Sequence, residues 1–332
     1  MSPWRAVQEW EMIPLAVHGA DAGPLGFEII TAVAINRDGT LAVADIRTCS
    51  ITLIDRPSGR FKSQWGGCGG GPGEFEQLTV ISFLGDTLLA YDRGRNIVIM
   101  LDGGGTEVSR IAPEFPPGTW IGAMHGLDSG LVLVALERVR ITPEDTADLS
   151  LAAILDLRSG KVTRWLAPEV GRARQGAQNV LRRKTVCVRP EAPSQIAILN
   201  DWAFEGIGVE LGAQARMFHF LTATPLLPSQ AGAGQWSPGA IAGVVCGENG
   251  IFFKHTRGGA RPPDGSPPIG SQSFLEMRGY DGSLLMRTSV TSDTSLIHGR
   301  LGAARGDTVF AFSNLLRDYP VVGEFLLAPR RP

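Results

Sequence analysis

A repeat of about 47 residues constrains the fold of this chain more than any other feature of its sequence. Displaced by that length, Thr87-Leu88 falls on Thr40-Leu41 and Asp92 falls on Asp45. A period of roughly 40 to 50 residues with several short strands per period is typical of a propeller blade. One such sheet cannot bury both of its faces alone, whereas a ring of blades packs face to face and leaves only short edges. The repeat therefore predicts a ring of small sheets.

The segments within each repeat have strand patterns. Thr40–Asp45 is apolar nearly throughout, which predicts an inner strand covered on both faces, and Ser50–Asp55 alternates in part. Asp38-Gly39 and Gly85-Asp86 lie between apolar runs and are typical of tight hairpins, because Gly and Asp tolerate the backbone angles that such turns need.

One stretch resembles a known family. It reads Gly71-Pro72-Gly73-Glu74-Phe75, then Gly85-Asp86-Thr87-Leu88, then Tyr91-Asp92-Arg93. This order is similar to the NHL-like six-bladed β-propellers, whose bacterial members carry a Gly-Pro-Gly-Glu-Phe link between blades. The resemblance extends over about residues 23–112 and, more distantly, over 285–328. It implies the fold but not an activity, since such propellers include lyases, lactonases, synthases and binding modules.

We therefore expect an all-β chain that forms one six-bladed propeller of four-stranded antiparallel blades over residues 1–332. The many glycines and prolines, 42 and 22, suit a fold with many turns. We expect residues 6–18 to close the ring by pairing with Val321–Leu327 in the last blade. The expected blades are about 27–66, 74–112, 119–167, 180–223, 239–288 and 293–328.

Composition limits the partners and the location. The formal charge of −2 argues against a nucleic-acid partner for the whole body, and no apolar run reaches the roughly 18 residues of a membrane span. The first residues contain no apolar signal core, so a cytoplasmic protein is expected, although many relatives are exported. The four cysteines lack metal-knuckle spacing. We expect free buried thiols, with two disulfides as the alternative.

The candidate site residues follow from the propeller geometry. Ligands of a propeller lie on its axis, at one mouth of the channel, beside the loops that enter the innermost strands. The predicted ligand-binding residues are Glu28, Gln77, Trp120 and Arg182. The predicted catalytic residues are Glu74, His125, Arg183 and His298. For Glu74, a structural role as an acceptor for nearby turn amides is the alternative.

Two histidines raise the question of a metal. His125 and His298 fall on the inner strands of blades three and six, which face each other across the axis, although at different heights. Imidazoles around a channel can hold a divalent cation that polarises a carbonyl or activates a water molecule. The related peptidyl-hydroxyglycine lyases and virginiamycin-type lyases use metal ions at such a mouth. For the calcium site of six-bladed lactonases, Asn200-Asp201 is the only nearby candidate.

The sequence leaves two classes of function open. The first is a binding module that holds a small molecule, a peptide or a partner protein at one mouth of the channel. The alternative is a lyase, cyclase or hydrolase that works through the same mouth. A basic cluster within residues 158–189 would suit RNA, but basic residues on exposed strand edges and loops explain most of it.

Overall fold

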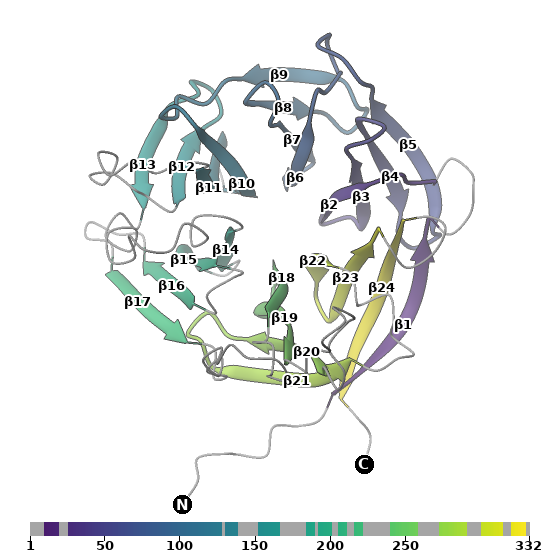
Figure 1. Cartoon of the computed structure of the whole chain (residues 1–332), viewed down its shortest axis with the longest axis vertical. Helices are drawn as coiled ribbons and strands as arrows, with labels where there is room; N and C mark the ends of the chain where they lie inside the picture. Colours follow the sequence, from purple (N-terminus) through teal and green to yellow (C-terminus); the bar gives the residue numbers. More distant parts are fainter. Residues whose placement is uncertain are drawn as a thin grey trace, which may run out of the picture.

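The structure is a computed structural model that describes residues 10–19, 26–127, 130–138, 152–166, 184–189, 192–200, 205–210, 216–221, 240–257, 272–290, 300–314 and 320–329. Its strands form six antiparallel sheets of four strands each. The sheets stand around one axis like the blades of a propeller (Figure 1). The predicted all-β, six-bladed fold is confirmed.

Each of the first five blades is a run of consecutive strands. Blade 1 contains β2 (Ile30–Ile35), β3 (Thr40–Asp45), β4 (Ser50–Asp55) and β5 (Arg60–Gly66). Blade 2 contains β6 (Leu78–Leu84), β7 (Thr87–Asp92), β8 (Ile97–Leu101) and β9 (Glu107–Ile111). Blade 3 contains β10 (Thr119–Gly126), β11 (Leu131–Arg138), β12 (Ala152–Asp156) and β13 (Val162–Leu166). Blade 4 contains β14 (Lys184–Arg189), β15 (Ala192–Asn200), β16 (Glu205–Glu210) and β17 (Arg216–Leu221). Blade 5 contains β18 (Ala240–Cys246), β19 (Ile251–Arg257), β20 (Gln272–Arg278) and β21 (Leu284–Val290).

Blade 6 combines the two ends of the chain. It contains β22 (Arg300–Arg305), β23 (Thr308–Ser313) and β24 (Val321–Pro329), and its outermost strand is β1 (Trp10–His18). β1 pairs with β24 antiparallel from Trp10 opposite Pro329 to His18 opposite Val322. The predicted closure of the ring by an N-terminal strand is confirmed, and β1 and β24 lie side by side in Figure 1.

The repeat positions equivalent residues at equivalent places. Thr40–Asp45 and Thr87–Asp92, which the repeat superimposes, are the second strands of blades 1 and 2. Gly39 and Gly85 have φ values of 94° and 59° in the turns that precede them. Because side chains disfavour this left-handed region, glycine is the residue that fits there. The predicted hairpins are confirmed.

The hydrophobic core consists of one cluster at each of the six seams between blades. At the seam of blades 1 and 2, for example, Ala42 and Ile51 pack with Leu78 and Leu88, and all four are fully buried. On the other face of β3, Leu41 and Val43 belong to the cluster at the seam of blades 6 and 1. This strand, the second of its blade rather than the innermost, therefore lies against protein on both faces, which explains why it is apolar nearly throughout rather than alternating.

Five of the six innermost strands, β2, β6, β10, β18 and β22, have a register shift near their first residues. In β10, Gly122 is the extra residue between Ile121 and Ala123, and in β22 it is Gly302 between Leu301 and Ala303. A Cβ on Gly302 would lie 2.7 Å from Cβ of Val33 in blade 1. The bulges thus allow neighbouring inner strands to approach closely around the axis.

We expect Gly302→Ala to lower the free energy of unfolding by about 1–3 kcal/mol, because the added methyl group overpacks the seam of blades 6 and 1. Gly67→Ala is the matched control, since a Cβ there meets no atom within 4 Å. Urea denaturation of both variants measures the difference. Equal stability of the two variants would contradict the close packing of β22 on β2.

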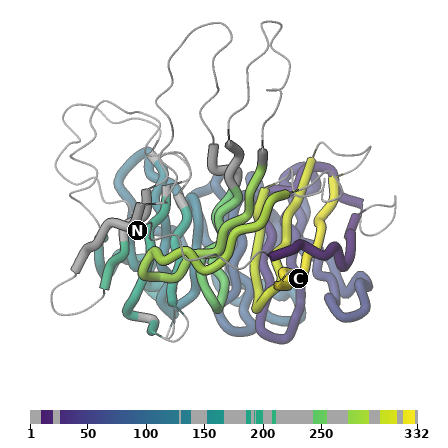
Figure 2. Tube along the Cα trace, turned by 90° about the horizontal axis from the view of Figure 1, so that it is seen from below, coloured from purple at the N-terminus to yellow at the C-terminus, as the bar shows by residue number. Residues whose placement is uncertain are grey.

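The two faces of the disc differ in their connections. On one face, the first strand of a blade turns into the second and the third turns into the fourth, and no connection there exceeds five residues. We call this the short-turn face. On the opposite face, the second strand leads to the third and each blade leads to the next. We call this the long-connection face, because the strand ends that it joins are separated by up to 18 residues of sequence, as between β17 and β18. Figure 2 shows the disc from the side.

All four cysteines form disulfides, so the expectation of free thiols is wrong. Cys49 bonds to Cys68 and Cys187 bonds to Cys246. The first bond ties the β3–β4 turn to the link between blades 1 and 2. The second joins β14 to β18, the inner strands of blades 4 and 5. In each case the fold brings together two cysteines that are far apart in the sequence, by 19 and 59 positions.

No helix among the described residues is long and apolar enough to cross a membrane.

Candidate functional site

A buried aspartate fixes the entrance to the inner strand of blade 2. Asp92, at the end of β7, accepts hydrogen bonds from the amides of Glu76 (2.8 Å) and Gln77 (3.0 Å). It also accepts one from Nε of Arg95 at 2.8 Å. Burial opposes the charged form of Asp92, but these donors and the Arg95 guanidinium outweigh it and lower the pKa of the carboxyl. Gln77 is therefore held at the start of β6, on the long-connection face.

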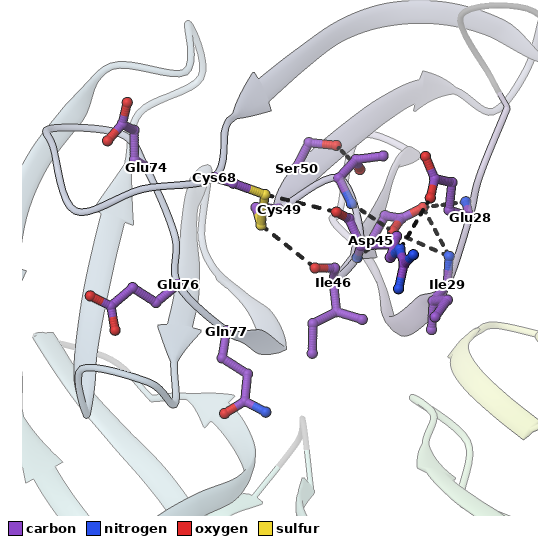
Figure 3. Close-up of a disulfide and its surroundings, with 12 residues drawn as sticks. Glu28, Ile29, Asp45, Ile46, Cys49, Ser50, Cys68, Glu74, Glu76 and Gln77 are labelled. Atoms are coloured by element: carbon purple, nitrogen blue, oxygen red, sulfur yellow. Dashed lines mark hydrogen bonds and ion pairs between the residues drawn. A yellow bond between two sulfur atoms is a disulfide. The ribbon is translucent and has the colours of Figure 1, made fainter.

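Asp45 fixes the entrance to the innermost strand of blade 1 in the same way (Figure 3). Its carboxylate accepts from the amides of Glu28 (2.5 Å), Ile29 (3.2 Å) and Arg47 (2.8 Å). The side chain of Glu28 lies 3.6 Å from Nε of Arg47, and both side chains are mostly exposed on the long-connection face. The repeat thus places Glu28 and Glu76 at matching points around the axis, and Gln77 matches Ile29.

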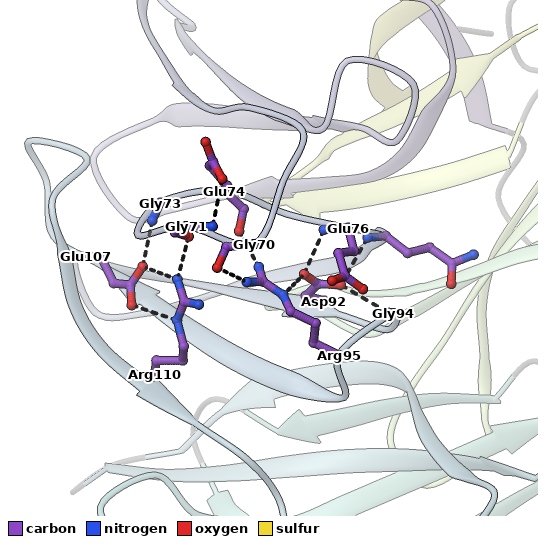
Figure 4. Close-up of polar contacts among 11 residues, drawn as sticks. Gly70, Gly71, Gly73, Glu74, Glu76, Asp92, Gly94, Arg95, Glu107 and Arg110 are labelled. Carbon is purple, nitrogen blue, oxygen red and sulfur yellow. Dashed lines mark hydrogen bonds and ion pairs between the residues drawn. The ribbon is translucent and has the colours of Figure 1, made fainter.

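Glu74 belongs to a turn that is stabilised from several sides (Figure 4). Its carboxylate accepts a hydrogen bond from the Gly71 amide at 2.6 Å, and its own carbonyl accepts one from Arg95. Glu107 accepts from the Gly73 amide at 2.7 Å. These contacts support the structural role of Glu74. A catalytic role for it stays a prediction.

A cluster of side chains on the long-connection face joins blades 2 and 3 at their seam. The guanidinium carbon of Arg93, in the β7–β8 turn, lies 5.1 Å from the centre of the Trp120 ring. Nη1 of Arg93 is 3.8 Å from Oε2 of Glu137, which lies opposite Trp120 across β10 and β11. The side chains of Arg93, Trp120 and Glu137 are partly exposed. We call these three residues the mouth cluster.

The β10 bulge makes room for this cluster. A Cβ at Gly122 would lie 2.7 Å from Cγ of Glu137. A larger residue would therefore displace the carboxylate from its place beside Arg93. A cation stacked on an indole, with a carboxylate beside it, can hold flat or charged groups of a ligand. Of the three side chains, only the Glu137 carboxylate could act as a nucleophile or base, and it lies beside the Arg93 guanidinium.

His125 occupies a different height from Trp120. It lies near the end of β10, five residues and so about 16 Å further along the strand, towards the short-turn face. Burial lowers the pKa of His125 to about 4, so the imidazole is neutral at physiological pH. A neutral imidazole can bind a metal or accept a proton, but the mouth cluster lies at the other end of the strand.

Several predicted residues lie outside the described residues, namely Arg182, Arg183, His298 and Asp201. The predicted pair of His125 and His298 is therefore not tested. Among the residues that the structure describes, no three His, Cys, Asp or Glu side chains are grouped so that they could hold a metal ion.

Sequence reasoning missed Arg93 and Glu137. Arg93 directly follows the repeated aspartate, Asp92, and so belongs to a turn on the predicted site's face. That position was the available signal. The sequence contained no comparable signal for Glu137, because its contact with Arg93 forms only when blades 2 and 3 pack together.

Comparison with known proteins agrees with the fold. No protein-family model matches the chain, and no curated protein matches it in sequence. Among solved structures, a member of the DUF4221 family from Bacteroides vulgatus matches with a TM-score of 0.67 and 10% identity, over 98% of this chain and 100% of the other.

Two further matches are enzymes or ligand binders by name. Regucalcin, a calcium-binding protein from Agrobacterium tumefaciens, matches with a TM-score of 0.55 and 14% identity over 96% of both chains. A streptogramin B lyase matches with a TM-score of 0.50 and 10% identity, over 96% of this chain and 97% of the other. At such identities the likeness shows the six-bladed propeller fold alone.

Proposed function

We propose that this chain is a binding propeller that takes up a small molecule, a peptide or a partner protein at the axis, on its long-connection face. The observation that carries the proposal is the difference between the two faces. Only short turns join the strands on one face, whereas the mouth cluster lies on the other, where the strand ends are further apart in the sequence. Function in propellers resides on variable loops held by a rigid scaffold.

The chemistry of the mouth cluster supports binding more than catalysis. Arg93 and Trp120 present a guanidinium and an indole, which stack on flat groups and attract anionic ones. Glu28 and Arg47 add an exposed pair of opposite charge at the start of β2. A relationship to the NHL-like propellers rests on the Gly-Pro-Gly-Glu-Phe link and stays a hypothesis.

The proposed site predicts which variants lose a ligand. A panel of metabolites and short peptides is screened for compounds that raise the melting temperature of the wild-type chain. We expect Arg93→Ala to weaken binding of the hits by about tenfold or more, since it removes the charge and the stack. Arg93→Lys keeps the charge without the planar group and should restore part of the affinity.

Asp86→Asn is the control, because Asp86 is exposed in a turn of the short-turn face. Hits that bind Arg93→Ala as well as wild type would contradict the proposed site. NMR spectra of each hit, recorded before and after incubation with the protein, show whether it is bound unchanged or converted. Conversion would favour the lyase, cyclase or hydrolase alternative at the same mouth.

We also propose that the protein works in an oxidising compartment rather than in the cytoplasm. Two disulfides are a feature of exported proteins and are rare where thiols are kept reduced. Thiol titration in denaturant tests this: protein exported to an oxidising compartment should show no free thiols and a higher melting temperature than cytoplasmic protein. Equal melting temperatures and four free thiols in both samples would contradict it.

A further inference from the structure

A groove at the closure of the ring lies apart from the mouth cluster. It has a volume of about 710 Å³, within the range of ligand sites. Its lining comes from β1, β24 and the short turns of blades 1, 5 and 6. The lining residues that matter here are Leu15, Asp38, Arg56, Glu248, Arg305 and Glu324.

The floor of the groove is a charged pair of the buried Glu324 and the partly exposed Arg56. Oε1 of Glu324 accepts from Nε of Arg56 at 2.7 Å, and Nη2 of Arg56 also donates to Oγ1 of Thr308 at 3.0 Å. These contacts leave Nη1 of Arg56 without a partner among the described residues. On the other side, Nε2 of His18 lies 3.8 Å from Oε2 of Glu324 and has no hydrogen-bond partner there, although His18 is 4% exposed.

The walls present charges of both signs. Glu248, in the β18–β19 turn, is exposed and makes no contact that would neutralise it within the described part of the chain. One carboxylate oxygen of Asp38 accepts a hydrogen bond from the Thr40 amide at 2.7 Å. Arg305 donates to the carbonyls of Asn36, at 3.1 Å, and Arg37. Neutral acceptors leave its positive charge uncompensated.

We propose that this groove binds a zwitterionic ligand of the amino-acid or short-peptide class. The ligand carboxylate would meet Arg56 and Arg305, and its ammonium group would meet Glu248 and Asp38. The exposed side chain of Leu15 offers an apolar contact for an aliphatic side chain. The site is independent of the mouth cluster, since none of its residues lies on the long-connection face.

Other ligand classes fit the lining less well. An anion would face three carboxylates, those of Asp38, Glu248 and Glu324, and a simple cation would face two guanidinium groups. The described residues contain no grouping of three metal-ligating side chains, here or elsewhere. A ligand that carries both a positive and a negative charge can pair with the guanidinium groups and with the carboxylates of the groove.

Four related dipeptide probes, which differ in their terminal charges, test the charge requirement. They are leucyl-leucine, its N-acetyl form, its amide, and the form that carries both caps. Calorimetric titration of the full chain should show that leucyl-leucine binds about tenfold more tightly than either singly capped form. The doubly capped form should bind least. Equal affinity of all four, or no saturation by leucyl-leucine at about 10 mM, would overturn the proposal.

Glu248→Gln tests the wall directly and does not touch the floor. It should weaken leucyl-leucine about fivefold and leave the N-acetyl form unchanged, because only the ammonium partner is lost. Asp86→Asn, in a short turn of blade 2 on the same face, should change neither. Unaltered binding of leucyl-leucine to Glu248→Gln would overturn the assigned orientation and with it the site.

Discussion

Replacing Cys187 and Cys246 together by alanine is expected to lower the free energy of unfolding by about 4 kcal/mol. The bond joins inner strands of neighbouring blades across a sequence separation of 59 residues. Its removal frees a long loop in the unfolded chain, so the entropy gained on unfolding rises. Urea denaturation under non-reducing conditions measures the loss.

The double alanine variant of Cys49 and Cys68 is the matched comparison. Those residues are separated by only 19 positions, and the same relation gives about 3 kcal/mol. The loss should therefore be smaller by about 1 kcal/mol. Reduction of the wild-type chain should reproduce the effect of both pairs together. If the double variant of Cys187 and Cys246 were as stable as wild type, the bond would not hold blades 4 and 5 together.

Glu324→Gln is expected to lower the free energy of unfolding by about 3 kcal/mol, since it leaves Arg56 without its carboxylate partner at the ring closure. Burial raises the pKa of Glu324, but its contacts with His18 and Arg56 outweigh burial and hold the pKa below the usual value. The stabilisation from Glu324 is thus present above the pKa of the unfolded chain. It is lost as the pH falls through the lower pKa of the folded chain.

Stability curves at several pH values check this sign. The difference between wild type and Glu324→Gln should stay constant from neutral pH to about pH 5 and shrink below about pH 4.5. Glu11→Gln, an exposed position on the paired strand β1, is the control and should follow wild type. A difference that persists unchanged into acid would show that the charge of Glu324 is not what stabilises the closure.

Much of the architecture could be predicted because it repeats. The period of the sequence placed Thr40–Asp45 and Thr87–Asp92 in equivalent strands, and their apolar runs indicated strands covered on both faces, although these are the second rather than the innermost strands of blades 1 and 2. The closing strand followed from the need to complete the last blade. The strands follow from local patterns of apolar residues, and the closure follows from the general requirement that a propeller ring has no open edge. Both can be recognised in a sequence.

The pairings between blades could not be predicted in the same way. Cys187 and Cys246 meet because two inner strands lie side by side, and the separation of 59 residues carries no sign of it. Arg93 reaches Trp120 and Glu137 from another blade for the same reason. Glu74 was visible as a charged residue in a turn, but only coordinates show its carboxylate on the Gly71 amide.

The pairing of β1 with β24 determines when the last blade can be completed during synthesis of the chain. During synthesis the first strand leaves the ribosome roughly 300 residues ahead of the strand that it must join. Until then β1 has no partner in its own sheet, and the Glu324–Arg56 contact cannot form. At about 5–20 residues per second, that wait lasts on the order of 15 to 60 seconds. Blade 6 can therefore be completed only after β24 has been synthesised, and the last strand of the chain closes the ring.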